Sequence, residues 1–278
     1  MTRSRLFAWL RRDLRAAISL AFLLALVLLA LCAPWLAPYP VTAQDVDNTL
    51  ASPSALHLMG TDDLGRDVFS RMVHGAAATL YASALAVGIA ILLGLPVGLL
   101  AGFLGGWVDD AISRFIDALL SFPSIVLAIA VTGALGIGLT NGMIAVGIVF
   151  SPQLARLVRA RALVVRQELY VDASRCFGAS TARILWRHVL PNTVQPVIVQ
   201  VTLLLAAALL AEASLSFLGL GIQPPDPSWG SMLARAYQNM ELAPEQMVAP
   251  GLAILLTALA FNTLGESLRV ALDPTTKR

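Results

Sequence analysis

The chain has 278 residues, of which 58% are hydrophobic and only 13% are charged. Soluble domains carry about a quarter charged residues, so this composition excludes an ordinary soluble enzyme and predicts a protein that lies mostly in a lipid bilayer. The formal net charge is only +2, and we expect no nucleic-acid partner.

The first apolar run follows a basic N-terminus and has no charge from residue 16 to residue 44. About 20 helical residues cross ~30 Å of hydrocarbon, so we predict a membrane-spanning helix near 16–36. Cys32 also weakly suggests a lipoprotein cleavage site. Leu31 is too bulky for the residue before such a site, and the run is longer than a signal peptide, so we expect an uncleaved helix.

Five further helices follow from the remaining apolar runs. An outer segment at 37–76 precedes helix 2 near 77–104, and helices 5 and 6 are expected near 193–216 and 247–267. The uncharged run 118–155 is too long for one crossing and predicts helices 3 and 4. Its middle holds residues that favour a tight turn: Gly133, Gly136, Gly138, Asn141 and Gly142.

Glycines at a regular spacing predict close helix packing. Gly94, Gly98 and Gly102 recur every fourth residue, as do Gly138 and Gly142, which lets helix backbones approach one another.

The distribution of basic residues sets the topology, because cytoplasmic loops collect Lys and Arg. Six helices with both termini inside place 16 of the 19 Lys and Arg residues in the cytoplasm, whereas one crossing over 118–155 would leave 7 inside and 12 outside. We therefore predict an all-α polytopic membrane protein with six transmembrane helices and cytoplasmic N- and C-termini. We assign 1–76 to an N-terminal tail, helix 1 and an extracytoplasmic segment, and 77–278 to a core with a cytoplasmic loop at 156–191.

That cytoplasmic loop is basic, and part of its charge is explained by membrane anchoring. Its pattern is not. Tyr170, Ala173 and Phe177 share one face of a short helix, and Gly178 offers a left-handed stop.

A second short helix is expected after this stop. Ser180 or Thr181 can cap it, its face holds Ile184, Leu185 and His188, and Pro191 is expected to end it. Two short amphipathic helices with a hinge between them suit a groove in a soluble partner.

Three motifs resemble one family of transporters. Asp172-Ala173-Ser174, Gly178 and Leu190-Pro191 keep the spacing of the EAA loop of ABC-importer permeases, with Asp172 in place of glutamate and Ser174 in place of alanine. HVLPN at 188–192 looks like the variant of the dipeptide, oligopeptide and nickel subfamily. GTDDLGRD at 60–67 and EASLSFLGLG at 212–221, followed by two prolines and PSWG, extend the similarity over nearly the whole chain. The chain resembles the second, C-type permease subunit of that subfamily.

The resemblance implies a role and a set of partners. Such a chain forms the translocation path for di- or oligopeptides, or for nickel chelates or antimicrobial peptides. It pairs with a homologous permease, cytoplasmic ATPases and an extracytoplasmic binding protein in the cell membrane. EAA-type coupling helices between helices 4 and 5 would dock on an ATPase through ten residues: Asp172, Ala173, Ser174, Arg175, Phe177, Gly178, Arg183, His188, Leu190 and Pro191.

The residues independently predict that the chain is not an enzyme. A phosphate-binding P-loop needs a lysine, and the only lysine is Lys277, so ATP and Mg²⁺ are expected on the partner ATPases, with no cofactor on this chain. No serine nucleophile elbow or HExxH motif occurs in the sequence. Cys32 and Cys176 predict neither a disulfide nor a thiolate metal site.

Glu212 is the one acid well inside an apolar helix. A charge near the bilayer centre costs on the order of 3 kcal/mol, so it should face the bundle interior, a partner or the headgroups. It either lies near the translocation path or bonds to a neighbouring helix or loop at the outer end of helix 5. A bundle with such an acid also fits a second class, a secondary transporter driven by an ion gradient.

The charged outer segment has a structural interpretation and a functional one. We expect His57 and His74 to be solvated or locally bonded rather than metal ligands. Four residues of alternating sign either form a local network, which we favour, or touch the binding protein: Asp62, Asp63, Arg66 and Asp67.

Overall fold

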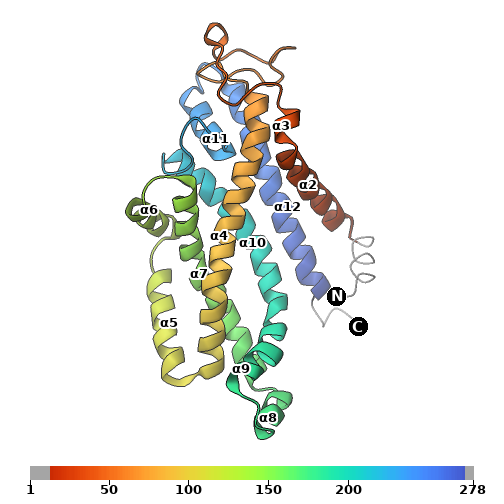
Figure 1. Ribbon diagram of the computed structural model, residues 1–278, viewed down its shortest axis with the longest axis vertical. Helices are drawn as coiled ribbons and strands as arrows, with labels where there is room; N and C mark the ends of the chain where they lie inside the picture. The colour runs from red at the N-terminus through yellow and green to blue at the C-terminus, as the bar shows by residue number, and fades with distance from the viewer. Residues whose placement is uncertain (1–12, 273–278) are drawn as a thin grey trace.

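A computed structural model of the chain describes residues 13–272, which form one elongated bundle of helices (Figure 1). The arginines before Asp13 and the lysine Lys277 lie outside these residues. We call the end with α8 and α9 the lower end and the end with residues 37–67 the upper end, as they stand in Figure 1.

The described helices follow in chain order: α2 (Leu14–Leu31), α3 (Ala33–Leu36), η1 (Val46–Asn48), α4 (Val68–Leu104), α5 (Gly106–Leu120), α6 (Ser124–Leu135), α7 (Leu139–Arg166), α8 (Leu169–Cys176), α9 (Thr181–Ile184), the π-helical η2 (Leu185–Val189), α10 (Leu190–Phe217), α11 (Trp229–Gln238), η3 (Pro244–Met247) and α12 (Val248–Leu272). Five helical stretches are long and apolar enough to cross a membrane, and α5 with α6, bent by 94°, makes a sixth if the pair is one span. The predicted all-α bundle of up to six spans is confirmed.

The first predicted helix is broken in the structure. Asp13 caps α2 by accepting hydrogen bonds from the backbone N–H groups of Arg15 and Ala16. The helix ends at Cys32, and α3 follows with Pro34 in its first turn. A proline has no N–H to donate to the preceding turn, so the single helix expected over 16–36 is divided here.

The second predicted helix begins earlier than expected. Asp67 caps α4 by accepting the Ser70 N–H at 2.7 Å, so the helix starts at Val68 rather than near 77. Arg71 is only 3% exposed although it lies in this first turn. Its charge suggested a loop, but it is buried against other segments, and the domain boundary drawn between 76 and 77 falls inside α4.

Glycines let α4 and α7 pack closely. A Cβ atom built on Gly94 would lie 2.6 Å from the carbonyl oxygen of Ser151, and Cβ atoms on Gly98 and Gly102 would also collide with the α7 backbone. The prediction of close packing from these three glycines is confirmed. Gly138 differs, because it precedes α7 with open space around it.

The connections on either side of α5 differ from the expected loops. Only Gly105 separates α4 from α5, and its φ of +69° allows the chain to reverse there without a loop. The predicted inner loop is therefore helical, and α5 is held to α7 by Arg159, which donates to Asp109. The tight turn expected in the glycine-rich region lies at 136–138, between α6 and α7.

The sequence interpretation did not include α11. Ser228 and Ser231 form a reciprocal capping box at its start, and Trp229, which is 1% exposed, donates its indole N–H to the Met72 carbonyl at 3.0 Å. Helix α11 thus lies against α4 at the upper end of the bundle (Figure 1). The serine pair three residues apart was the signal that could have predicted it.

Candidate functional site

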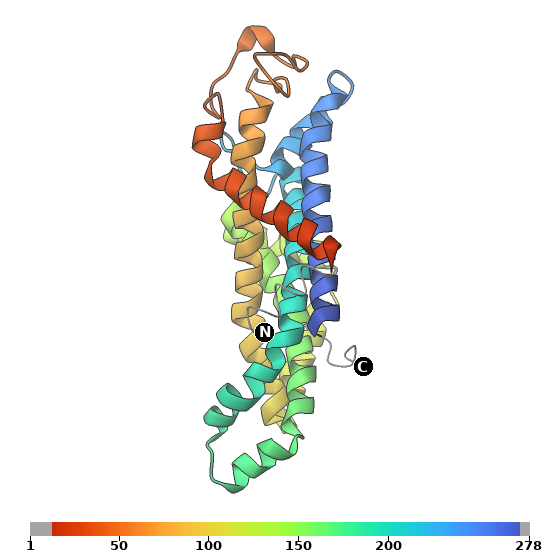
Figure 2. The same cartoon turned by 90° about the vertical axis from the view of Figure 1, so that its right-hand side faces the viewer.

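The coupling segment, residues 167–192, projects from the lower end of the bundle. It comprises α8, the turn 177–180, α9, η2 and the first residues of α10. In both views it extends well beyond the lower end of α12 (Figures 1 and 2). A segment in this position is available to a partner.

The turn between α8 and α9 has the geometry of a helix stop. Gly178 has φ +76°, and its N–H donates to Arg175 O at 2.9 Å while the Ala179 N–H donates to Ser174 O at 3.0 Å. This pair of hydrogen bonds is a Schellman motif, which needs a left-handed residue and so favours glycine. The predicted left-handed stop at Gly178 is confirmed, as is the cap by Ser180, whose hydroxyl accepts from the Arg183 N–H.

Pro191 does not end the second short helix, contrary to the prediction. The chain is helical without interruption from Thr181 to Phe217, through the π-helical η2 into α10. A π turn shifts the hydrogen-bond register by one residue, and such bulges accommodate a proline that cannot donate. The part of the coupling segment after the turn, α9 and η2, is therefore a direct continuation of the membrane-spanning helix α10.

Apolar side chains fix the base of the coupling segment to the bundle. Val171 of α8, Ile184 of α9 and Val189 of η2 are at most 1% exposed, and they pack in one cluster with Phe103 at the end of α4 and with the end of α7. The base of the segment is therefore packed on the lower ends of α4 and α7.

Polar contacts join α8 to the part of the coupling segment that follows the turn at 177–180. Asn192 donates to the Tyr170 hydroxyl at 3.2 Å, the Tyr170 and His188 rings lie 5.8 Å apart, and the Ser174 hydroxyl lies 3.3 Å from His188 Nε2. These contacts join α8 to η2 and the start of α10, so that the segment is one unit.

The outer face of the coupling segment is apolar and exposed. Phe177 is 91% exposed, Leu169 85% and Trp186 73%. Leu169 and Phe177 lie at the two ends of α8, whereas Trp186 lines an apolar cleft with Leu99 and Leu100 of α4. Leu169 and Trp186 were missed in the sequence.

The predicted docking residues all lie in this segment. Seven are exposed: Asp172, Ala173, Arg175, Phe177, Gly178, Arg183 and Pro191. Ser174, His188 and Leu190 are half-buried, and the first two contact each other between α8 and η2. Asp172 accepts a hydrogen bond from Arg175 at 3.2 Å, so two of the exposed charges are paired with each other.

Glu212 lies inside the bundle, at the upper part of α10. It is 1% exposed, and its Oε1 accepts hydrogen bonds from the hydroxyls of Ser216 and Ser228, both at 2.8 Å. Ser228 is the capping residue of α11. These contacts are those of a carboxylate that joins α10 to the outer loop, which was one of the two alternatives for this residue.

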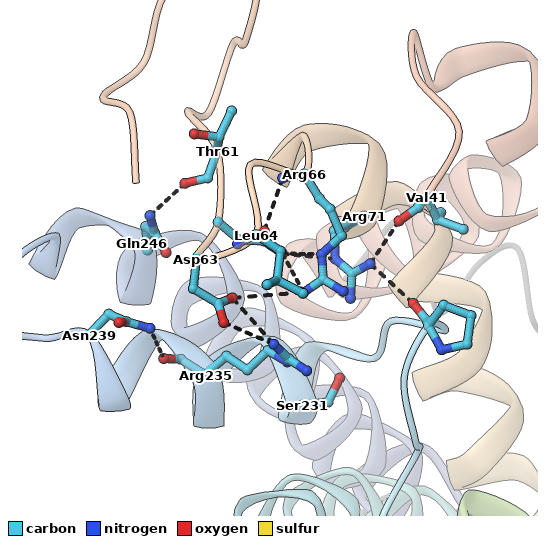
Figure 3. A network of polar contacts seen from close by, with 12 residues as sticks. Val41, Thr61, Asp63, Leu64, Arg66, Arg71, Ser231, Arg235, Asn239 and Gln246 are labelled. Carbon is cyan, nitrogen blue, oxygen red and sulfur yellow. Dashed lines mark hydrogen bonds and ion pairs between the residues drawn. The ribbon is translucent and has the colours of Figure 1, made fainter. Parts of the chain in front are cut away.

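A charged network occupies the upper end (Figure 3). Asp63 accepts from Arg235 of α11 at 3.0 and 3.3 Å, and Gln246 of η3 donates to the Thr61 carbonyl at 2.6 Å. Arg71 of α4 donates to the carbonyls of Val41 and Pro225. The network thus joins residues 41–71 to residues 225–246, two regions that are far apart in sequence.

The local network predicted for the acidic and basic residues of 62–67 is confirmed. Arg66 pairs with Asp62 at 2.7 Å, and His57 Nδ1 lies 2.9 Å from Asp67 Oδ1. His74 Nδ1 lies 2.9 Å from a backbone carbonyl oxygen. Residues 13–272 contain no group of three or more His, Cys, Asp or Glu side chains that could hold a metal ion.

Comparison with protein families now identifies the chain. Residues 94–278 match the family described as binding-protein-dependent transport system inner membrane component. The chain belongs to this family of ABC-importer permeases. Residues 6–53 of the permease match a second family, the N-terminal transmembrane domain of oligopeptide transport permease C.

Curated relatives match almost the whole permease. It is 49% identical over 268 residues to the glutathione transport system permease protein GsiD of Shigella flexneri serotype 5b, which covers 96% of this chain and 88% of the relative. The GsiD protein of Escherichia coli O6:K15:H31 is 47% identical with the same coverage.

Solved structures confirm the fold. The permease resembles chains of the MetNI methionine ABC transporter in two crystal forms, with TM-scores of 0.57 and 0.60 and sequence identities of 19% and 20%. The matches cover 72% and 73% of this chain and 95% and 97% of the others. At these identities the similarity establishes the architecture alone.

Family membership confirms the coarser predictions from the sequence. The permease is a multi-pass inner membrane protein and a transport subunit, not an enzyme. An ABC-importer permease works with ATPase and substrate-binding partners, so the alternative of an ion-gradient-driven transporter is set aside.

Proposed function

We propose that the permease forms part of the translocation path for di- or oligopeptides. The named relatives are glutathione permeases, and glutathione is a tripeptide. The N-terminal match to an oligopeptide permease domain supports the same substrate class. Nickel chelates and antimicrobial peptides are the alternatives, and the uptake measurement below separates nickel chelates from peptides.

Within this function, the coupling segment is the docking site for a cytoplasmic ATPase. The observation that carries this assignment is the contrast between its two sides. Phe177 and Leu169 are exposed on the outer side, while Val171 and Ile184 are buried against the bundle on the other. Buried aromatic and aliphatic anchors dominate the affinity of protein interfaces, so Phe177 is suited to fill a pocket in the ATPase.

The same geometry supplies a mechanical link. Helix α9, η2 and α10 form one continuous helix, and the base of the segment packs on the ends of α4 and α7. A displacement of the docked ATPase is therefore passed directly to three membrane-spanning helices. ATP and Mg²⁺ stay on the ATPase, and this chain binds no cofactor of its own.

The proposed orientation follows from charge. Five arginines lie on α7, α8 and α9 toward the lower end, and they support an orientation with the coupling segment and both termini in the cytoplasm: Arg159, Arg161, Arg166, Arg175 and Arg183. The upper end then faces the extracytoplasmic binding protein, and a homologous permease completes a heterodimer.

A matched pair of glycine variants tests the docking assignment. Gly178 and Gly219 have φ values of +76° and +78°, and both have open space at Cβ, but they lie at opposite ends of the molecule. A left-handed β-branched residue costs roughly 1–2 kcal/mol, which distorts the local turn without a steric clash. The full importer is expressed with Gly178→Val or with Gly219→Val, purified in mild detergent and reconstituted in liposomes.

We expect Gly178→Val to insert normally but to retain about tenfold less ATPase, and to lose most ATP-dependent uptake of glutathione or a dipeptide. Gly219→Val should retain the ATPase. Equal ATPase retention by both variants would contradict docking at the coupling segment. Uptake of a nickel chelate without uptake of any peptide by the parent importer would contradict the peptide class.

A further inference from the structure

A cleft in the bundle is not used by the docking proposal. It has a volume of about 480 Å³ and lies between the lower parts of α7, α10 and α12. Its charged lining residues are Arg161 of α7 with Glu266 and Arg269 of α12, and Gln195 and Gln200 of α10 also line it. Helix α12 ends near this level, while α7 and α10 continue toward the coupling segment (Figure 1).

The charges in the cleft favour an anion. Arg269 lies 3.7 Å from Glu266, and both side chains are mostly exposed, so this pair is a weak one. Arg161 makes no hydrogen bond or ion pair with any residue in 13–272. Two guanidinium groups against one carboxylate leave the cleft with a net positive charge, and guanidinium groups suit phosphate oxygens.

The walls of the cleft are apolar on the side toward the middle of the bundle. Leu157, Val199 and Leu203 line it, and Leu210 continues the α10 face of Leu203 seven residues farther along. Leu203 and Leu210 are 39% and 51% exposed, so this face is available to hydrocarbon.

Helix α12 presents a matching apolar face. Leu259 and Leu252 lie seven and fourteen residues before Glu266 and are 51% and 48% exposed. At ~1.5 Å per residue, this leucine row extends about 20 Å from the charged mouth. That distance exceeds the ~15 Å depth of one leaflet's hydrocarbon.

We propose that this cleft binds one anionic phospholipid. The phosphate lies between Arg161 and Arg269, Gln195 and Gln200 bond to the glycerol or headgroup oxygens, and the acyl chains follow the leucine rows of α10 and α12. Basic pockets between helices at the membrane surface bind anionic headgroups in this way. On the orientation proposed above, the lipid belongs to the cytoplasmic leaflet.

A zwitterionic peptide leaving the translocation path is the competing occupant. Its charges would match Arg161 and Glu266. A peptide would not cover the leucine rows, which continue for about 20 Å away from the charges. A water-filled path would require polar walls there. The apolar faces therefore favour a lipid.

Native mass spectrometry of the assembled importer tests the proposal. The complex is purified in mild detergent and incubated with phosphatidylglycerol or with phosphatidylcholine at equal concentrations. We expect retention of one phosphatidylglycerol per permease at concentrations where phosphatidylcholine is not retained. The double variant Arg161→Gln and Arg269→Gln should lower this retention about tenfold or more, because each charged hydrogen bond is worth roughly 1.5–3 kcal/mol.

Arg114→Gln is the matched control, since it removes the same charge from an exposed position on α5 outside the cleft. It should retain phosphatidylglycerol like the parent complex. Equal retention of the two lipids, unchanged retention by the double variant, or displacement of the lipid by glutathione would each overturn the proposal. These measurements involve no transport, so their failure is distinct from failure of the peptide-import proposal.

Discussion

Glu212 accepts hydrogen bonds from the buried hydroxyl groups of Ser216 in α10 and Ser228 at the start of α11. Replacement by alanine leaves the buried hydroxyls of Ser216 and Ser228 without that carboxylate and leaves a void. Each unsatisfied buried group costs on the order of 1–3 kcal/mol. Glu212→Ala should therefore lower the melting temperature of the purified permease measurably, whereas Glu212→Gln, which keeps an acceptor oxygen in place, should lower it less.

Transport separates the structural role of Glu212 from a role in the path. With a structural role, Glu212→Gln keeps most peptide uptake in reconstituted importer. A variant that keeps the parent melting temperature but loses uptake would show that the carboxylate meets the substrate.

Single residues of the coupling segment were partly predictable. The sequence indicated the stop at Gly178, because a left-handed residue after an amphipathic turn is a local requirement of the backbone. The effect of Pro191 was predicted wrongly. Whether a proline ends a helix or is accommodated by a π turn depends on packing around Val189 and on the demand for a continuous α10, which are tertiary effects.

At the scale of helices, the α4–α7 contact offers a matched pair of glycines. Gly98 lies against the α7 backbone at Ala155, while Gly88 on the same helix has nothing within 4 Å of an added Cβ. Gly98→Ala should cost roughly 1–3 kcal/mol of stability through overpacking. Gly88→Ala should be neutral or stabilise by about 0.5–1 kcal/mol, since alanine is the better helix former.

Thermal unfolding in detergent, followed by tryptophan fluorescence, which includes that of the buried Trp229, measures both variants. A drop in melting temperature for Gly88→Ala as large as that for Gly98→Ala would show that the close α4–α7 packing is not the cause.

Helices were predictable where apolar runs had clear ends and not where charged residues are buried. The start of α4 was placed too late because Arg71 and His74 are typical of loops, yet Arg71 is bonded to Val41 and Pro225 in other segments and His74 to the backbone of its own helix. Helix α11 was missed because it is short and its burial of Trp229 depends on α4. The hydropathy of a segment indicates whether it lies in lipid or in water, but it contains no information on contacts between distant segments.

At the scale of the whole molecule, the Asp63–Arg235 pair joins the outer segment to α11. Reversing one charge with Arg235→Asp places two carboxylates together and should destabilise the upper end by about 1 kcal/mol, given that the pair is partly exposed. The double variant Asp63→Arg with Arg235→Asp restores opposite charges and should recover part of this loss.

Limited proteolysis of residues 37–67 in reconstituted permease checks the prediction. Faster cleavage in the single variant and slower cleavage in the double variant is the expected order. Identical cleavage rates in all three proteins would show that the pair contributes nothing to holding this segment.

The upper network also sets an order of events during synthesis. The partners Asp63 and Arg235 are 172 residues apart in the chain, and Thr61 and Gln246 are 185 apart. The ribosome therefore releases the outer segment and most of the membrane helices before their last contacts exist. Until α11 and η3 emerge, Asp63 has only its neighbour Arg66 as a basic partner and Thr61 lacks Gln246, so the nascent permease must pass through a stage in which its upper end is assembled only in part.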